Sequence, residues 1–471
     1  MTTSPPSQCP FHADQPRPPV RHAPGVWPPG PAVGLGWGAL RRMSRDLLAL
    51  VAEWQRDFGD VVYLRIWPEH QIVVTDPDLA RELLVNHHDD LIRWERGMQV
   101  FGEVHGQSVL VVEGAAWKAK RHALQPGFSR HSVHAFVPTM VAAAGDAFAR
   151  WPRHDDAWRI ESAITSLAMD VIVRMMFSSE IGDDARMAEE ATHTLIVAMY
   201  KGLYWPVGSP RWVPWKRAAR KAQAVLDGLI DRHLQARLRM ARDAWPDDLL
   251  SRLLTLHLHD PATWPLQAVH AECMTSFLAG HETSAATLTW WAWCMAANPA
   301  AQTHARDEVR RVLQGAAPDG DTVAALPYLT QTLQETLRLY PTAPVLSSRR
   351  STNPLNVGPW QLPARTMFMV PVQLMHHDPR WFADPLTFRP ERFGPDAPDY
   401  PRGAYMPFGA GPRVCLGQHL AMTEMSVIAA MLLQRFELSV PDGMSAPRPV
   451  LNVSLRPEVP LRLRVREVER D

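Results

Sequence analysis

The sequence predicts a mainly α-helical fold with a small β region, formed by one domain. Helical periodicity recurs along most of the 471 residues, and strand-like alternation is confined to a few short segments. The 33 residues between Pro265 and Pro299 contain no proline, which leaves room for a helix that crosses a whole domain at about 1.5 Å per residue. Because no long linker interrupts the chain, we expect a single domain over residues 26–471.

Composition and charge exclude several classes of protein. The chain is 46% hydrophobic, enough for a large core, and its 49 basic and 49 acidic residues leave no net charge to attract nucleic acid. The cysteines are too few for a disulfide framework and form no C-x-x-C pair for zinc or an iron–sulfur cluster. A reducing compartment fits this pattern, and we expect a cytoplasmic protein. The four cysteines are Cys9, Cys273, Cys294 and Cys415.

The N-terminal segment is predicted to be a disordered tail over residues 1–25. Ten of the first 31 residues are proline, and such a segment stays extended rather than packing. It also lacks the charged flank and apolar core of a secretory signal. The most apolar stretch, residues 273–297, carries His281 and Glu282 near its middle, which argues for a buried helix rather than a transmembrane one.

The elements follow in chain order from hydrophobic spacing and turn residues. Residues 38–58 have the spacing of an amphipathic helix, and residues 61–75 are predicted to form a hairpin, with apolar runs on either side of a polar turn. Strand-like pieces lie near 367–372 and 449–466. Further helices are predicted at 78–86, 115–125, 131–152, 160–178, 185–200, 215–242, 247–256, 266–297, 299–314, 329–340 and 416–435.

Between two of these helices lies a segment that is rich in aromatic residues and broken by prolines. It is either a lid over an apolar pocket or a surface connection that its tryptophans anchor. The sequence leaves both interpretations open. The aromatic residues are Tyr200, Tyr204, Trp205, Trp212 and Trp215.

The run from Phe408 to Gly417 delivers a lone cysteine to the start of an apolar helical stretch. Glycines at 409, 411 and 417 allow a tight backbone with positive φ, and they let the chain pass close beneath a flat macrocycle. The positive end of the helix dipole and unpaired backbone N–H groups favour a deprotonated thiol at Cys415. This arrangement is suited to holding a thiolate against an iron, with the amides tuning the sulfur.

Phe, Gly, Arg, Cys and Gly at this spacing should occur by chance in roughly one chain in tens of thousands. The run resembles the haem-binding signature of the haem-thiolate cytochromes, the cytochrome P-450 superfamily, of the soluble bacterial type. The resemblance implies a mainly helical domain that binds haem b, with Cys415 as the iron ligand. It implies that Phe408, Arg413 and Gly417 belong to the haem-binding loop.

The centre of the long helix is predicted to form the oxygen side of such a site. Thr283 is placed to bond back to the carbonyl of Ala279, which loosens the helix beside Gly280 and makes space for dioxygen. Glu282 diverges from Thr283 by about 100° around the helix, so its carboxylate is expected to face a water channel. The resemblance implies that Glu282 and Thr283 are the acid–alcohol pair that relays protons, and that Ala279 and Gly280 border the haem. His281 points to another side and is not expected to bind iron.

Burial of the two haem propionates requires cations and N–H donors. Trp117 and Arg121 stand four residues apart on one helical face, and they resemble the W-x-x-x-R pattern of the family. Arg413 and Arg349 resemble two further propionate contacts, although the adjacent Arg350 leaves the choice at that position open.

Two further motifs predict the scaffold behind the cysteine loop. Residues 335–338 resemble the E-x-x-R motif of the family, and residues 385–393 resemble its P-x-x-F-x-P-x-R-F. Glu335 and Arg338 share a helical face, and Arg392 can complete a buried ion network with them. We expect this network to be structural.

The resemblance also places residues around a substrate above the haem. They include the loop 93–114 and are mostly apolar, which favours a small lipophilic substrate. The candidate pocket residues are Phe277, Val345, Leu346 and Val453.

The function that the resemblance implies is a monooxygenase that inserts one atom of O2 into a lipophilic substrate. Electrons from NAD(P)H would arrive through a separate ferredoxin or flavodoxin and its reductase, because the 56 residues after Cys415 are too few for a flavin or iron–sulfur module. A monomer is expected. An acidic carrier would dock on basic residues near the cysteine, which can equally serve propionates or solvent. These residues are Lys118, Lys120, Arg402 and Arg413.

Two alternatives stay open. A peroxide-driven or electron-independent enzyme would use the same iron, but the Glu282–Thr283 pair argues against it. A non-catalytic haem sensor or electron carrier would need a second strong axial ligand, and none is evident in the sequence.

Overall fold

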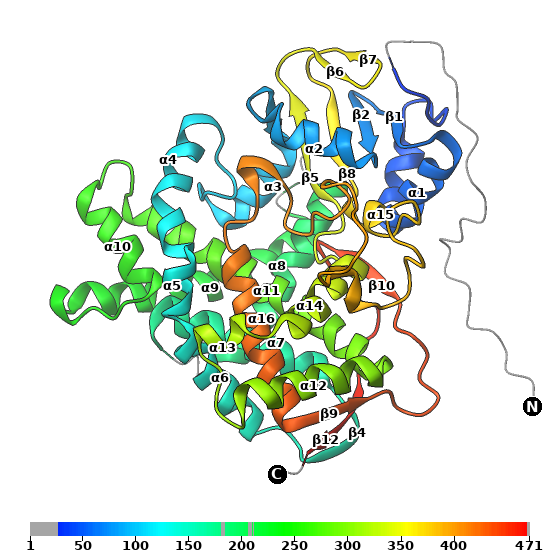
Figure 1. Ribbon diagram of the computed structural model, residues 1–471. Coiled ribbons are helices and arrows are strands. Elements are labelled where there is room, and N and C mark those ends of the chain that lie inside the picture. The colour runs from blue at the N-terminus through cyan, green and yellow to red at the C-terminus, as the bar shows by residue number, and fades with distance from the viewer. Residues whose placement is uncertain (1–26, 180–183, 206–209, 211, 469–471) are drawn as a thin grey trace, which may run out of the picture.

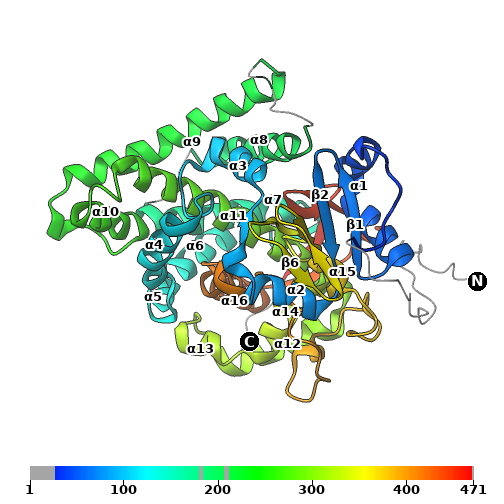
Figure 2. The same ribbon diagram turned by 90° about the horizontal axis from the view of Figure 1, so that it is seen from above.

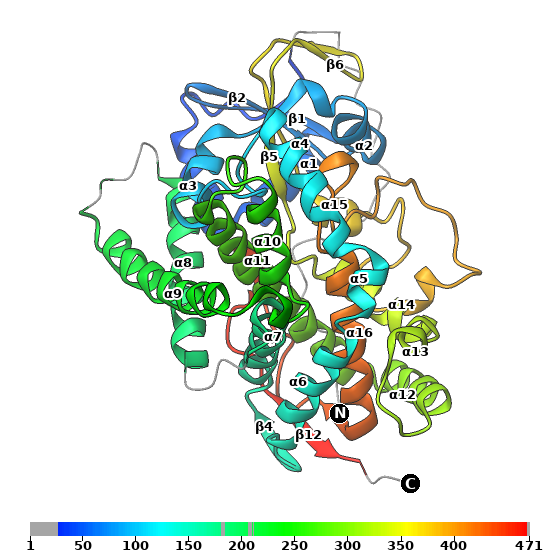
Figure 3. The same cartoon turned by 90° about the vertical axis from the view of Figure 1, so that its left-hand side faces the viewer.

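The computed structural model describes residues 27–179, 184–205, 210 and 212–468. The predicted tail over residues 1–25 lies outside these residues. In the part that is described, helices dominate and the strands gather in small sheets, as the sequence predicts (Figure 1). The five-stranded sheet and the three-stranded sheet lie at opposite ends of the helical body (Figures 1 and 3).

The helices agree closely with the predicted segments. They are α1 (Trp37–Phe58), α2 (Pro77–Val85), α3 (Glu95–His105), α4 (Gly114–Leu124), α5 (Arg130–His134), α6 (Val137–Ala149), α7 (Ile160–Phe177), α8 (Asp184–Tyr204), α9 (Pro214–Arg239), α10 (Leu249–His259), α11 (Leu266–Ala297), α12 (Pro299–Leu313), α13 (Gly320–Ala324), α14 (Pro327–Leu339), α15 (Val372–His376) and α16 (Gln418–Arg435). Short 3-10 turns are η1 (His88–Asp90), η2 (Gln125–Phe128), η3 (Arg242–Ala244), η4 (Pro390–Phe393) and η5 (Gly411–Arg413).

The helices differ from the prediction at four places: one predicted helix is divided, and α3, α13 and α15 are not predicted. The helix predicted at 131–152 is divided into α5 and α6, because Pro138 in the first turn of α6 suits a helix start but not a helix interior. The sequence does not predict α3, whose 11 residues include Gly97 and Gly102. Glycine lowers helix propensity, so tertiary packing rather than local preference stabilises this helix.

The main sheet has the strand order β1-β2-β8-β5-β3, in which β2 and β8 are parallel and the other pairs are antiparallel. Its strands are β1 (Val61–Ile66), β2 (Glu69–Val74), β3 (Leu91–Arg93), β5 (Leu346–Ser351) and β8 (Met367–Val370). The remaining strands form small antiparallel sheets: β4 (His154–Trp158) with β12 (Leu463–Glu467) and β9 (Phe436–Ser439), β10 (Pro449–Asn452) with β11 (Ser454–Pro457), and β6 (Leu355–Val357) with β7 (Trp360–Leu362).

Helix α11 runs through the middle of the helical body (Figures 2 and 3). It contacts α3, α7, α9, α14 and α16, which explains why its sequence is apolar on nearly all sides. Trp290 is fully buried in it, and its indole N–H donates to the Leu455 carbonyl oxygen at 2.9 Å. The Trp290 ring also stacks on Tyr340 at 4.0 Å. A helix that is packed against so many elements gives the residues at its centre a rigid support.

Candidate active site and cofactor pocket

The cysteine loop is shaped by two glycines and ends at the start of α16. Gly409 (φ 76°) and Gly411 (φ 71°) adopt the left-handed conformation. The Cys415 N–H donates to the Phe408 carbonyl oxygen at 2.9 Å, which closes the loop. At Gly411 an added Cβ would lie 2.0 Å from the carbonyl oxygen of Leu84. The loop therefore packs directly on the end of α2.

The Cys415 thiol is accessible and yet desolvated. Its side chain is exposed, yet burial raises its pKa, and the Gly417 amide and the Arg121 guanidinium act against that rise. A group that is accessible and still desolvated lies in an interior space rather than at the outer surface. A thiol with an amide and a cation directed at it is suited to bind iron as a thiolate. Gly417 itself has φ −86°, so its backbone does not require glycine.

We expect Gly411→Ala to destabilise the protein by at least about 1 kcal/mol, because alanine is strained at this φ and its Cβ collides with the backbone of α2. Gly417→Ala is the matched control, since a Cβ there meets no protein atom within 4 Å. Chemical denaturation of the two variants measures the difference. Equal unfolding free energies would contradict this description of the loop.

The centre of α11 presents a narrow accessible stripe on an otherwise buried helix. Ala279 and Thr283 are exposed and lie one helical turn apart, while Ser284 beside them is buried. The Thr283 hydroxyl donates to the Ala279 carbonyl oxygen at 2.7 Å, which is the bond that their spacing predicts. Ser284 Oγ donates to Glu424 Oε2 at 2.7 Å, which ties this part of α11 to α16. The stripe therefore opens into the interior close to the helix that follows the cysteine loop.

Three neighbouring residues of α11 turn away from this stripe. Phe277 and His281 are buried, and their rings lie 6.5 Å apart. Burial lowers the pKa of His281 to about 4, so its imidazole is neutral. Gly280 packs against α7, where an added Cβ would lie 3.0 Å from Ile172 Cδ1. The haem contact expected of Gly280 stays a prediction, and its small size already has a structural reason.

The expected orientation of Glu282 toward a water channel is wrong for this structure. The Glu282 carboxylate accepts hydrogen bonds from Arg456 Nε at 2.7 Å, from Arg456 Nη2 at 2.8 Å and from Ser454 Oγ. Burial acts to raise the pKa of Glu282, but the Arg456 guanidinium outweighs it and holds the pKa below its usual range. Glu282 is therefore the ionised partner in a buried ion pair.

An arginine cluster lies at the end of the cysteine loop. Arg93, Arg349 and Arg413 line one small cavity. Glu113 balances part of their charge, because Arg93 Nε donates to it at 2.6 Å and Arg413 Nη2 donates to its other oxygen. Burial and neighbouring cations lower the pKa of Arg413 to about 9 and that of Arg349 to about 10. Three guanidinium groups around one carboxylate leave an excess of positive charge, which fits the two propionates of a haem.

Of the two adjacent arginines, Arg349 faces this cluster and Arg350 does not. Arg350 donates to Glu69 at 2.7 and 2.8 Å and to Glu95 at 2.6 Å. Arg349 and Arg350 are neighbours in β5, and successive side chains of a strand point to opposite faces. The geometry therefore supports Arg349 as the residue that can contact a propionate.

Trp117 and Arg121 lie on α4, close to the same region. The Arg413 guanidinium lies 3.8 Å from the centre of the Trp117 ring. Burial lowers the pKa of Arg121, whereas the negative charge of a Cys415 thiolate acts to raise it. Arg121 and Cys415 are therefore close enough to interact. Among the residues that the structure describes, Arg121 has no hydrogen bond or ion pair. A half-buried guanidinium in this state fits a cofactor that carries its own carboxylates.

Glu335, Arg338 and Arg392 come together behind the cysteine loop. Arg338 Nε and Nη2 donate to the two carboxylate oxygens of Glu335 at 2.7 and 2.8 Å, and both side chains are fully buried. Arg392 Nε donates to Glu335 at 3.3 Å. Arg338 Nη1 also donates to the carbonyl oxygens of His376 and Pro385, each at 2.7 Å. The network joins α14 to the segment that leads to the cysteine loop.

The expected docking role of Lys120 is wrong. Lys120 is buried, and its Nζ donates to Glu272 at 2.8 Å and lies 4.6 Å from the centre of the Trp264 ring. This contact fastens α4 to α11 and leaves no charge for a partner protein. Lys118 and Arg402 are exposed, so these two stay candidates for docking.

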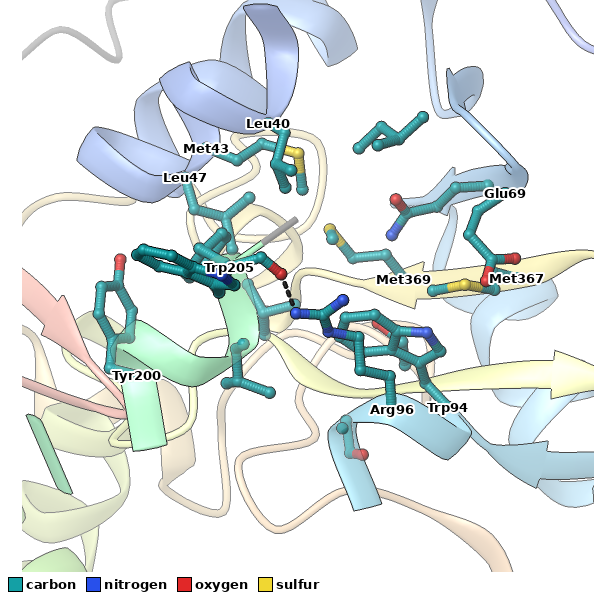
Figure 4. Close-up of a pocket in the computed structure, with 18 of the residues that line it drawn as sticks. Leu40, Met43, Leu47, Glu69, Trp94, Arg96, Tyr200, Trp205, Met367 and Met369 are labelled. Atoms are coloured by element: carbon teal, nitrogen blue, oxygen red, sulfur yellow. Dashed lines mark hydrogen bonds between the residues drawn. The ribbon is translucent and has the colours of Figure 1, made fainter. Parts of the chain in front are cut away.

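An apolar cavity of about 420 Å³ extends from β5 toward the outer surface (Figure 4). Its walls come from α1, the β1–β2 turn, α3, the end of α8, strands β5 and β8, and the β10–β11 turn. Three of the candidate pocket residues, Val345, Leu346 and Val453, line it, whereas Phe277 does not, and their contact with a substrate stays a prediction. A Cβ added to Gly409 would lie 3.9 Å from Leu346 Cδ2. Leu346 therefore lies between the cavity and the cysteine loop.

The aromatic segment after α8 contributes directly to this cavity. Tyr200, Tyr204 and Trp205 line it, which supports the interpretation of this part as a cover over an apolar pocket. Arg96 of α3 donates to the Trp205 carbonyl oxygen and joins the two sides of the wall (Figure 4). Trp212 is 79% exposed, so it neither covers this cavity nor anchors the segment.

Two properties of the described ranges concern membrane spans and metal-binding side chains. No helix in them is long and apolar enough to cross a bilayer. They also contain no group of three or more His, Cys, Asp or Glu side chains that could hold a metal ion.

An accessible thiol in an enclosed loop, an alcohol on the central helix and an excess of arginines define a site for a haem-thiolate enzyme. Comparison with known proteins gives the same class. The family model described as "Cytochrome P450" matches residues 24–465. The chain belongs to the cytochrome P450 family, and it is an oxidoreductase that incorporates oxygen.

The relatives come from plants and bacteria. Cytochrome P450 714D1 from Oryza sativa subsp. japonica is 30% identical over 88% of this chain and 77% of its own length. Cyclooctat-9-en-7-ol 5-monooxygenase from Streptomyces melanosporofaciens is 30% identical over 87% of this chain and 88% of its own length. Cytokinin hydroxylase from Arabidopsis thaliana is 28% identical over 88% of this chain and 83% of its own length. The likeness covers most of each protein at low identity, so it supports the family and not a particular substrate.

Proposed function

We propose that this protein is a haem-thiolate monooxygenase that inserts one atom of dioxygen into a small lipophilic substrate. The observation that carries the proposal is the Cys415 thiol, which lies in an enclosed space with an amide and a cation directed at it. When bound there, haem b supplies the activation of dioxygen, and electron donation from a thiolate favours O–O cleavage. The residues that would hold it are Cys415 at the iron, Trp117, Arg121, Arg349 and Arg413 at the propionates, and Phe408, Gly417 and Ala279 around the ring.

The chain supplies the proton path and the substrate space. Insertion of one oxygen atom into a C–H bond releases the other as water, and this uses two electrons and two protons. The Thr283 hydroxyl lies on the accessible stripe and, when it turns from the Ala279 carbonyl oxygen, can donate a proton there. Glu282, one position away, can replace that proton. Because Glu282 is ionised in its pair with Arg456, it must first take up a proton from solvent. A lipophilic substrate that fills the site would limit the entry of other water.

We expect Thr283→Ala to lower the amount of product formed per NAD(P)H consumed, because the hydroxyl that passes the proton is removed while electron supply is unchanged. Thr283→Ser is the control, since it retains the hydroxyl. Parallel assays of product and NAD(P)H measure the ratio. An unchanged ratio in the alanine variant would show that Thr283 does not relay protons.

Electrons are proposed to come from NAD(P)H through a separate ferredoxin or flavodoxin and its reductase, which would dock near the exposed Lys118 and Arg402. Support for an uncharged lipophilic substrate comes from the cavity walls and from the relative that is named for cyclooctat-9-en-7-ol. The test is turnover under isotopically labelled dioxygen with such a partner pair. Label in the product supports a monooxygenase, whereas turnover with peroxide alone would favour the peroxide-driven alternative.

A further inference from the structure

The β10–β11 hairpin connects the apolar cavity to Glu282. Strand β10 lies against α1 and α8, and strand β11 lies against α11. On the cavity side, Leu451 and Val453 line the wall. On the other side, Ser454 and Arg456 donate to the Glu282 carboxylate. One short turn therefore touches the contents of the cavity and holds the acid on α11.

The turn is strained at the residue that lines the cavity. Val453 has φ 71°, a conformation that a β-branched residue rarely adopts. It stands between Asn452 and Ser454, which are paired across the hairpin. Such strain persists only where surrounding contacts enforce it, and it is concentrated at sites that switch. The bonds from Ser454 and Arg456 to Glu282 are contacts of this kind.

Arg456 has a second carboxylate within reach. Its Nη1 donates to Glu161 Oε1 at 3.1 Å, while Nε and Nη2 hold Glu282 at 2.7 and 2.8 Å. The Arg456 side chain is 18% exposed and each carboxylate side chain is 13% exposed, so an unpaired charge here would be costly. Because Glu161 keeps Arg456 paired, release of Glu282 does not leave the guanidinium without a partner.

We propose that Ser454 and Arg456 are positioning residues through which a substrate in the cavity controls proton delivery by Glu282. Contact of a lipophilic substrate with the cavity side of the turn relaxes the turn, loosens its hold on Glu282 and shifts Arg456 toward Glu161. The freed carboxylate then exchanges protons with solvent and serves Thr283. The inference rests on the proposed function of Glu282, and it makes proton delivery depend on an occupied cavity.

Binding linkage gives a test that does not require turnover. If an occupied cavity favours release of Glu282, then a change that releases Glu282 favours binding in the cavity by the same factor. The probe is Nile red, an uncharged dye that fluoresces in apolar surroundings, and its dissociation constant is measured with the haem-loaded full-length protein. Glu282→Gln weakens the pair with Arg456, so we expect Nile red to bind at least about fivefold more tightly.

Glu161→Gln is the matched control, and we expect it to act in the opposite direction. It removes the alternative partner of Arg456, so Arg456 holds Glu282 more firmly and Nile red binds more weakly than to the unaltered protein. A merely structural role predicts shifts of the same sign, because each variant removes one charge from the same buried cluster. If Glu282→Gln does not fold, Ser454→Ala takes its place, with a smaller gain in affinity expected.

Opposite shifts in the two carboxylate variants support the inference. Shifts of the same sign, unchanged affinities, or the absence of saturable Nile red binding would each overturn it. Thermal unfolding of each variant checks that it is folded. Failure of the proposed function would be seen in a different measurement, the carbon monoxide spectrum of the reduced protein. The dye titration does not depend on that spectrum, so the two failures can be told apart.

Discussion

Replacing Cys415 with alanine is expected to reduce oxygen insertion to the background level and to lower the haem content of the purified protein sharply. Alanine removes the one sulfur that the loop directs into the enclosed space. The iron then loses its protein ligand, and the electron donation that favours O–O cleavage is lost with it. Absorption spectra measure haem content, and product assays with a reconstituted electron donor measure turnover.

Two other cysteines provide matched controls for this variant. Cys273 and Cys294 are fully enclosed in α11, and burial raises the pKa of both thiols, so they are protonated and unreactive. Cys273→Ala and Cys294→Ala should retain haem and turnover. A Cys415→Ala protein that behaves like these two controls would refute the assignment of the ligand.

Arg338→Met is expected to lower the free energy of unfolding by about 3–5 kcal/mol, because it leaves the Glu335 carboxylate buried without its main partner. The variant also loses the bonds from Arg338 to the carbonyl oxygens of His376 and Pro385. These residues precede the cysteine loop, so haem retention should fall together with stability. Denaturant unfolding followed by tryptophan fluorescence and by haem absorbance measures both effects.

Arg42→Met is the control for this ion pair. Arg42 pairs with Glu53 at 2.6 Å, but the two side chains are 58% and 37% exposed, and exposed pairs contribute about 1 kcal/mol or less. Its unfolding free energy should therefore stay close to that of the unaltered protein. If Arg338→Met cost no more than Arg42→Met, the network behind the loop would not have the structural role proposed for it.

The parts that could be predicted from the sequence depend on short-range chemistry. A left-handed turn needs glycine at 409 and 411, and a thiolate needs a helix start after Cys415, so neighbouring residues carry the signal. The bond from Thr283 to Ala279 follows from helical spacing alone. In the same way, the long proline-free stretch is the helix α11.

The parts that could not be predicted depend on residues far apart in the chain. Glu282 meets Ser454 and Arg456, which are 172 and 174 positions away, and Lys120 meets Glu272, which is 152 positions away. No local pattern distinguishes such buried pairs from solvated charges. Arg93 could not be predicted for the same reason, because its place in one cavity with Arg349 and Arg413 depends on how β3 pairs with β5.

The central claim is that Cys415 binds haem iron as a thiolate. The absorption spectrum of the reduced full-length protein with carbon monoxide tests this claim most directly. Our account predicts a strongly red-shifted Soret band in the unaltered protein and the loss of that band in Cys415→Ala. An unshifted band in the unaltered protein would contradict thiolate ligation and, with it, the proposed function.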